Sequence, residues 1–317
     1  MEKEKKYILV LGGSGFLGMN VINHYQQELQ EFVEFDLVFI VVGKTQTLQI
    51  RSNCIQVQID YTNEQELRNL MLSYPIDEVF HFISTSVPAT SNANIKYDVV
   101  SNLLSTLTLL ELMREFDIKK IIYLSSGGTV YGEHLEMKYQ EDYLRTPNNS
   151  YGVLKLTIEN YIRLYQKLFG VNYLILRVSN PFGMFHHSNV NGLINIAIRK
   201  SMNNEPIQIW GDGTSTKDYI FASDLARIFW QLRELNCYND VVNIGSGKLY
   251  SINDIVGYIK MILPQTTWIY QDEKIFDTRH SDFTIEKLMS KINIRSTPIL
   301  EAIESTYCWE KTKLNKL

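Results

Sequence analysis

Three glycines spaced three residues apart follow the first apolar run of the chain, residues 7–11, and open a helical pattern. In such a strand–turn–helix unit the first glycine permits a tight turn, the second lets the backbone approach a pyrophosphate, and the third lets the helix pack against the strand. The unpaired N–H groups at the start of the helix then face the phosphates. A strand precedes this turn and a long strand–helix alternation follows it, so a dinucleotide site is favoured over a glycine-rich loop that binds nothing. The residues of the predicted site are Gly12, Gly15, Phe16, Leu17 and Gly18.

Apolar runs recur along the first 178 residues and alternate with helical patterns. Six of them are expected to be strands, at residues 7–11, 37–42, 54–59, 78–83, 120–125 and 172–178. Runs that are apolar throughout, rather than at every second position, indicate a parallel sheet buried on both faces. Leucine-rich helical patterns at 99–116 and 151–168 supply two of the covering helices. We predict an α/β fold whose first domain, residues 1–178, is a Rossmann-type doubly wound parallel sheet that binds the dinucleotide.

The regular alternation loosens after residue 178, where turns, helices and short strands mix. We predict that residues 179–317 form mainly a smaller α/β substrate-binding lobe, with helices at 191–203 and 223–235. The apolar run 241–244 is a candidate for a strand that returns to the main sheet.

The charge balance excludes several classes of partner. Thirty-one Lys and Arg residues against 35 Asp and Glu residues give a net charge of -4, which argues against nucleic acids and anionic membrane surfaces. The three cysteines are far apart, and no nearby cysteine or carboxylate completes a metal site with His186 and His187. The sequence shows no signal peptide and no apolar run of membrane-spanning length. We therefore expect a cytoplasmic protein that acts on small molecules and holds no metal.

Tyr151 and Lys155 open the helical pattern that follows a hydroxyl-rich turn, and they share one helix face. A tyrosine ordinarily ionises near pH 10, so it is a poor base at neutral pH until a nearby ammonium and an oxidised nicotinamide stabilise its phenolate. Lys155 can supply that charge, while a hydroxyl at the end of the preceding strand holds the substrate oxygen. The same spacing occurs twice more near the C-terminus, but only Tyr151 begins a helix at the sheet edge where α/β folds hold their ligands. The pair predicts proton transfer coupled to hydride transfer.

These motifs, taken in order with several later ones, resemble the extended short-chain dehydrogenases/reductases of the nucleotide-sugar epimerase, dehydratase and reductase group. The resemblance covers nearly the whole chain and includes the segments 81–84, 176–183, 210–221 and 243–247. It implies cofactor contacts, beside those of Tyr151 and Lys155, from Asp60, Tyr61, Phe82, Ser84, Asn102 and Ser125. It implies contacts to a nucleotide-diphosphate sugar from Ser86, Asn180, Lys217, Tyr219 and Arg279.

The chain departs from the family pattern in the turn before Tyr151. The family's catalytic serine or threonine falls on Gly127, which has no hydroxyl, so Ser126 or Thr129 must substitute. Family dehydratases place an Asp-Glu pair where this chain has Gly128 and Thr129. Elimination of water is therefore disfavoured.

The end of the second strand leaves the choice between NAD and NADP open. Members that bind NAD usually place an acid there to bond the adenine ribose, whereas this strand ends in Val42, Gly43 and Lys44. A cation suits the 2′-phosphate of NADP, so Lys44, with Arg51 nearby, keeps NADP as an alternative. Asp36 recovers the acid's role only if it stands at the end of the strand instead of before it.

Three functions follow as hypotheses. The leading one is a nucleotide-sugar 4-epimerase of the UDP-hexose type. In it, Tyr151 deprotonates the 4-hydroxyl and bound NAD takes the hydride. The 4-keto sugar then rotates, and the hydride returns to its other face. The alternative is a reductase of a nucleotide-linked 4-keto-6-deoxy sugar that uses NADPH, and the third is a non-catalytic dinucleotide-binding scaffold. The resemblance also implies a homodimer joined through the helices at 99–116 and 151–168.

Overall fold

The computed structural model describes residues 4–31, 36–43, 53–132, 138–272 and 280–314. At its centre is a parallel sheet of seven strands in the order β10-β6-β5-β4-β1-β2-β3. These strands are β1 (Lys5–Leu11), β2 (Asp36–Val42), β3 (Cys54–Val57), β4 (Ile76–His81), β5 (Lys120–Ser126), β6 (Asn172–Val178) and β10 (Asp240–Ile244). The expected Rossmann-type α/β fold is confirmed, and so is the return of residues 241–244 to the main sheet.

β1 lies inside this sheet and shows why its strands are apolar throughout. Ile8, Leu9 and Val10 are all 0% exposed. Successive side chains of a strand point to opposite faces, so Ile8 and Val10 join one apolar cluster and Leu9 joins the other. A sheet buried on both sides requires helices on both sides.

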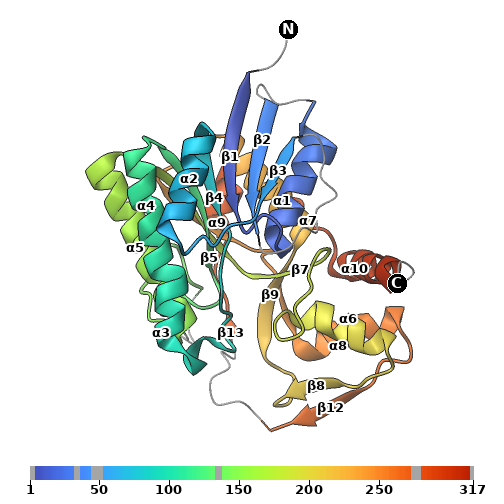
Figure 1. Ribbon diagram of the computed structural model, residues 1–317. Coiled ribbons are helices and arrows are strands. Elements are labelled where there is room, and N and C mark those ends of the chain that lie inside the picture. The colour runs from blue at the N-terminus through green and yellow to red at the C-terminus, as the bar shows by residue number, and fades with distance from the viewer. Residues whose placement is uncertain (1–3, 32–35, 44–52, 133–137, 273–279, 315–317) are drawn as a thin grey trace.

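Helices cover both faces of the sheet (Figure 1). One face carries α2 (Glu64–Ser73), α4 (Ser105–Glu115) and α5 (Ser150–Phe169). The other face carries α1 (Phe16–His24), α7 (Ala222–Glu234) and α9 (Glu286–Lys291). This arrangement is doubly wound, and it leaves the carboxyl ends of the strands open toward the second lobe.

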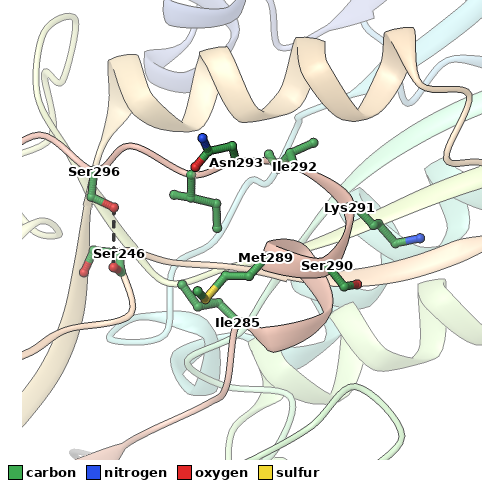
Figure 2. Close-up of a pocket in the computed structure, with 9 residues that line it drawn as sticks. Ser246, Ile285, Met289, Ser290, Lys291, Ile292, Asn293 and Ser296 are labelled. Atoms are coloured by element: carbon green, nitrogen blue, oxygen red, sulfur yellow. Dashed lines mark hydrogen bonds between the residues drawn. The ribbon is translucent and has the colours of Figure 1, made fainter.

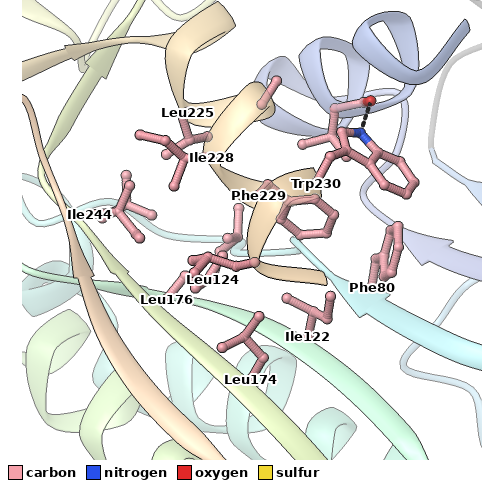
Figure 3. Close-up of a cluster of buried hydrophobic side chains, with 14 of the residues drawn as sticks. Phe80, Ile122, Leu124, Leu174, Leu176, Leu225, Ile228, Phe229, Trp230 and Ile244 are labelled. Carbon is pink, nitrogen blue, oxygen red and sulfur yellow. Dashed lines mark hydrogen bonds between the residues drawn. The ribbon is translucent and has the colours of Figure 1, made fainter. Parts of the chain in front are cut away.

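α7 packs on the main sheet, although the sequence pattern placed residues 223–235 in the substrate lobe. The rings of Phe229 and Trp230 are 0% and 1% exposed and pack edge-on against Phe80 of β4 (Figure 3). The indole N–H of Trp230 also donates a 2.8 Å hydrogen bond to the carbonyl of Val21 in α1. The apolar face of a helix does not say which sheet it covers, and this is why the sequence interpretation of this helix was wrong.

The long helix expected at 99–116 is divided into two segments and is preceded by a third. α3 (Ile95–Asp98) runs into a π-helical turn, η3 (Val99–Leu104), which α4 then continues. A π-turn accommodates an extra residue and is frequent at functional sites. Here it holds Asn102, one of the predicted cofactor residues. Two other short helices are η1 (Tyr25–Leu29) and η2 (Ser91–Ala93).

The second lobe follows β6 and has an apolar cluster of its own. Its strands are β7 (Asn180–Phe182), β9 (Thr216–Phe221), β11 (Leu249–Ser251) and β13 (His280–Ser281) in one small sheet, and β8 (Ile207–Trp210) with β12 (Trp268–Gln271) in another. Its helices are α6 (Leu193–Met202), α8 (Ile252–Ile262) and α10 (Ile299–Leu314) (Figure 1). In the part of the chain that the structure describes, no helix has the length and apolar character needed to cross a membrane.

Candidate active site

The turn between β1 and α1 has the backbone geometry that its glycines predict. Gly12 has a φ of +81°, and a Cβ atom there would lie 3.0 Å from the backbone nitrogen of Ile83. A Cβ atom on Gly18 would lie 2.5 Å from the carbonyl oxygen of Gly12. Gly15 is exposed at the helix N-cap, where no side chain caps the first N–H groups and no acid stands in the first turn. These donors fit the pyrophosphate of a dinucleotide.

A loop of the second lobe reaches this turn. The rings of Phe16 and His186 meet edge-on with 4.8 Å between their centroids, and Asn20 donates a 2.9 Å hydrogen bond to the carbonyl of Met184. Leu17 packs against the main core. The loop histidine is therefore a packing partner of α1, and no cluster of metal ligands occurs among the described residues.

Three more predicted cofactor residues lie at the carboxyl edge of the sheet. The exposed carboxylate of Asp60 accepts a 2.7 Å hydrogen bond from the Thr62 hydroxyl. Tyr61 donates a 2.5 Å hydrogen bond to the carbonyl of Ser101 in η3. Phe82 follows β4, and its backbone packs against Gly12. Of the three, Phe82 lies against the glycine turn, and the contacts of all three with a cofactor stay predictions.

The tip of β2 has no room for an acid. A Cβ atom on Gly43 would lie 1.8 Å from the Oγ atom of Ser14 in the glycine turn. Asp36 begins β2 and pairs with the first residue of β1, at the far end of both strands from that turn. Asp36 therefore cannot take over the ribose contact. The predicted cation Lys44 and its neighbour Arg51 lie outside the described residues.

α5 brings Tyr151 and Lys155 to the end of β5. Asn149 caps this helix by accepting a 2.9 Å hydrogen bond from the N–H of Gly152. Lys155 Nζ donates to the carbonyl of Leu124 at 2.8 Å and lies 5.5 Å from the centre of the Tyr151 ring. The predicted pair therefore shares one helix face and one edge of the sheet.

Burial shifts the ionisation of both groups. It raises the pKa of Tyr151 to about 12; a hydrogen bond with Ser84 opposes this shift and the charge of Asp98 reinforces it. Burial lowers the pKa of Lys155 to about 8, while the carboxylates of Glu159 and Asp98 oppose that shift. At neutral pH the pair is therefore a phenol beside an ammonium, and the ammonium stabilises the phenolate that proton transfer creates.

Position 127 has no room for the family's catalytic hydroxyl. A Cβ atom on Gly127 would lie 2.8 Å from the ring of Phe283 and 3.1 Å from the carbonyl oxygen of Arg177. Phe283 is 5% exposed and belongs to the main core. The hydroxyl predicted to hold the substrate is therefore expected from another residue of the turn.

The three predicted hydroxyls of this turn have different surroundings. Ser125 donates a 2.5 Å hydrogen bond to buried Glu159, so its side chain is engaged inside the protein. Ser126 ends β5 and is half-buried. The hydroxyl of Thr129 is buried without a hydrogen-bond partner among the described residues, and its backbone carbonyl packs against Gly152, next to Tyr151. Ser126 and Thr129 therefore both stay predictions for the hydroxyl that holds the substrate.

Asn102 ties η3 to the loop after β4. Its Oδ1 atom accepts a 2.9 Å hydrogen bond from the N–H of Thr85, and its Nδ2 atom donates to Asp98 at 2.8 Å. In the same loop the Ser84 hydroxyl donates to the carbonyl of Ser86 at 3.0 Å. Asn102 thereby fixes the loop that places Ser84 beside Tyr151. Sequence analysis missed Asp98, whose one signal is its place a helical turn before Asn102.

A small cavity joins the pair to this loop, and a larger hollow lies elsewhere. The polar residues that line the small cavity are Ser84, Ser86, Asp98, Asn102, Thr106, Tyr123, Tyr151 and Lys155. The larger hollow has a volume of about 530 Å³ and is lined by Ser246, by residues 285 and 289–294, and by Ser296 (Figure 2). There Ser296 donates a 3.4 Å hydrogen bond to the carbonyl of Ser246. No predicted site residue lines the larger hollow, whereas Ser84, Ser86, Asn102, Tyr151 and Lys155, all predicted site residues, line the small cavity.

The predicted substrate residues of the second lobe lie on neighbouring strands. Asn180 of β7 pairs in register with Tyr219 of β9, and its side chain donates a 2.8 Å hydrogen bond to the carbonyl of Asp218. Lys217 stands beside them in β9, while Tyr219 is 5% exposed in the apolar cluster of the lobe. Arg279 lies outside the described residues. Their contacts with a substrate stay predictions.

Comparisons with known proteins agree with this geometry. A family model described as the NAD dependent epimerase/dehydratase family matches residues 8–245. A putative UDP-glucose 4-epimerase of Methanocaldococcus jannaschii is 33% identical over 254 residues, which cover 80% of this chain and 81% of that protein. A dTDP-4-dehydro-6-deoxyglucose reductase of Escherichia coli is 30% identical over 308 residues, 95% of this chain and 96% of that protein.

One solved structure adds a bound ligand pair to the comparison. A UDP-glucuronic acid 4-epimerase from Bacillus cereus, in complex with UDP-glucuronic acid and NAD, matches with a TM-score of 0.86 and 25% identity. The match covers 97% of this chain and 99% of that one.

Proposed function

Because this chain belongs to the NAD dependent epimerase/dehydratase family, we propose that it is a 4-epimerase acting on the hexose of a nucleotide-diphosphate sugar. The observation that carries the proposal is the pair Tyr151 and Lys155, held at the same sheet edge as the phosphate-binding turn. A scaffold that only binds a dinucleotide has no need of a desolvated tyrosine–ammonium pair.

The residues of the chain supply the proton chemistry. When bound, the nicotinamide cofactor accepts and returns a hydride at carbon 4. Tyr151 takes the proton of the 4-hydroxyl, and Lys155 stabilises the resulting phenolate. Thr129 or Ser126 holds the substrate oxygen. Tyr151 returns the proton when the 4-keto sugar is reduced on its other face, so the cycle consumes neither a proton nor a reductant.

We assign the cofactor and substrate to opposite sides of this centre. Gly12, Gly15 and Gly18 would hold the pyrophosphate of NAD or NADP through the N-terminus of α1. Asn180 and Lys217, on paired strands of the second lobe, would hold the nucleotide diphosphate. Lys217 carries the charge that this role needs, as a point charge rather than a bidentate fork.

A reductase of a nucleotide-linked 4-keto-6-deoxy sugar is the second candidate. The specific observation in its favour is the tip of β2, where Ser14 fills the space of any side chain on Gly43, so the acid typical of NAD-binding members is absent. The Escherichia coli relative of this name also matches nearly the full chain. In this reaction Tyr151 gives its proton to the 4-keto oxygen, and each turnover consumes NADPH and one proton.

Analysis of the nucleotide released on denaturation separates the two candidates. Tightly held NAD, together with conversion of a UDP-hexose to its 4-epimer without added cofactor, is the result expected of an epimerase. A protein purified empty that oxidises NADPH with a dTDP-4-keto-6-deoxyhexose would overturn the epimerase and establish the reductase. Absence of turnover with every nucleotide sugar would exclude both enzymes and leave the hypothesis of a non-catalytic dinucleotide-binding scaffold.

We also propose a cytoplasmic homodimer joined through η3 and α5. Val100 and Leu104 of η3, with Leu164 and Leu168 of α5, are exposed apolar side chains on neighbouring helices. Covering them with a second copy removes apolar surface from water. Light scattering should give twice the chain mass of 36.9 kDa, and a monomer at micromolar concentration would contradict the dimer.

A further inference from the structure

Asp98 is a buried carboxylate that the proposed chemistry does not use. It ends α3, is 1% exposed, and accepts hydrogen bonds from Asn102 at 2.8 Å and from the Ser150 hydroxyl at 3.0 Å. Both donors are neutral, and within the described ranges no Lys, Arg or His forms a direct ion pair with it. A charge taken out of water in this way is costly unless an opposite charge faces it.

The opposite charge in the same cavity is Lys155. Asp98 and Lys155 both line the small cavity beside Tyr151. Lys155 is itself buried at 6% exposure, and its ammonium donates to a backbone carbonyl, that of Leu124. A neutral carbonyl satisfies a donor but does not balance a charge, so the ammonium also needs an anion near it.

Glu159 is the other carboxylate near Lys155, but its charge is already balanced. It pairs with Arg177 at 2.7 Å, with both side chains 0% exposed, and it accepts the Ser125 hydroxyl at 2.5 Å. Asp98 has no such cation. Glu159 raises the pKa of Lys155 more than Asp98 does, but it shares its charge with Arg177, so Asp98 is the carboxylate near Lys155 that has no cation of its own among the described residues.

We propose that Asp98 is the counter-ion of Lys155, a positioning residue that keeps the ammonium charged in the closed cavity beside Tyr151. The proposal rests on the proposed function only for its effect on turnover. The π-helical turn that begins after Asp98 places this carboxylate and Asn102 at the same cavity. Asp98 thus acts through Lys155 and takes no proton itself.

The other groups that face Lys155 do not replace Asp98. Tyr151 and Tyr123 are phenols whose pKa values burial raises. His81 of β4 is neutral, because burial and the charge of Lys155 lower its pKa to about 3. The pKa of Lys155 at about 8 is what remains after burial lowers it and the charges of Glu159 and Asp98 raise it.

The test is a pH titration of Lys155 itself, followed by the carbon shift of ε-¹³C-labelled lysine and assigned by its loss in Lys155→Met. Asp98→Asn keeps the shape and hydrogen-bonding capacity but removes the charge, so the ammonium should lose its proton about one pH unit lower. Asp98→Ser, which is smaller, should give the same direction if the first variant does not fold. An unchanged midpoint in either folded variant would overturn the proposal.

Two controls separate charge from structure. Asp117→Asn removes an exposed carboxylate at a φ of 56° that asparagine tolerates, and it should leave the Lys155 midpoint unchanged. Ser150→Ala removes a hydrogen bond to Asp98 but no charge, so the midpoint should not fall. A fall in Ser150→Ala equal to that in Asp98→Asn would assign the effect to structure and contradict the counter-ion.

This titration needs no substrate, so it is independent of the proposed function. If no nucleotide sugar is turned over while the midpoint falls in Asp98→Asn, the proposed function fails and the counter-ion stands. If the enzyme epimerises sugars and the midpoint is unchanged, the counter-ion fails alone. In an active enzyme the alkaline limb of the rate should move with the midpoint.

Discussion

The cofactor half and the substrate half of the site are determined in different ways. On the cofactor side, backbone atoms set the geometry: Gly12 and Gly18 lie where any Cβ would meet other backbone atoms at 3.0 Å or less. On the proposed substrate side, Asn180, Lys217 and Tyr219 lie on paired strands, and the ends of their side chains would decide what is bound. The contrast shows that a motif which encodes backbone geometry identifies its ligand class more sharply than one which encodes side-chain recognition.

The catalytic pair between the two halves should show the largest effect. Tyr151→Phe removes the group that exchanges a proton with the sugar, so turnover should fall at least about 100-fold while cofactor binding is retained. The measurement is a steady-state rate alongside a nucleotide-binding titration. Normal turnover in this variant would refute the role of Tyr151, and joint loss of binding and turnover would mean that the cofactor half had been disturbed.

A methyl group in the glycine turn should specifically disrupt the packing and the dinucleotide binding of the cofactor half. Gly18→Ala places a Cβ 2.5 Å from two backbone atoms, so we expect a loss of about 1–3 kcal/mol in the free energy of unfolding and weakened dinucleotide binding. Gly257→Ala is the matched control, since nothing lies within 4 Å of a Cβ there and the residue is inside α8. It should gain about 0.5–1 kcal/mol. Urea unfolding measures the free energy of unfolding of both variants. A Gly18→Ala protein as stable as wild type would contradict the packing argument.

A substitution in the substrate half should have a smaller effect on activity and should leave cofactor binding unchanged. Lys217→Ala removes a charge assigned to the diphosphate, and KM should rise about tenfold, or about 1.4 kcal/mol, with little change in kcat. Lys217→Arg should retain or lower KM because arginine grips phosphate with two parallel donors. A fall in kcat with unchanged KM would place Lys217 in the chemistry and erase the division between the halves.

The pH dependence of turnover should show the smallest effect, and it tests the burial of Lys155 between the two halves. Because burial lowers the pKa of Lys155 to about 8, turnover should fall as the pH rises through about 8, where the ammonium loses its proton. Lys155→Arg keeps its charge far above that pH, so its alkaline decline should disappear whatever its maximal rate. A wild-type decline only near the ordinary lysine value of about 10.4 would show that Lys155 is not desolvated in the working enzyme.

The sequence predicted most of the sheet because apolar strands carry their own signal. All six expected strands occur, as does the returning strand β10. The wrong assignment of α7 has a physical cause, since an apolar helix face packs equally well on either lobe and the choice depends on distant rings such as Phe80 and Trp230. The local sequence pattern therefore does not show which lobe the helix packs on.

The placement of candidate site residues was predictable where a local motif carries it, and it was hidden where a residue far along the chain determines the surroundings. Tyr151, Lys155 and the glycines belong to the first kind. The closed space at Gly127 belongs to the second, because Phe283 fills it from more than 150 residues away. Asp98 was hidden too, since only the folded π-turn and cavity show that it shares a lining with Lys155.

The most direct test of the central claim follows the hydrogen at carbon 4. The protein is incubated with UDP- and dTDP-hexoses deuterated at carbon 4, and the products are analysed by NMR. The account predicts the 4-epimer with deuterium retained at carbon 4, because the hydride that leaves the sugar returns to the same carbon. Product that has exchanged its deuterium with solvent, or no reaction at carbon 4 in any of these sugars, would contradict it.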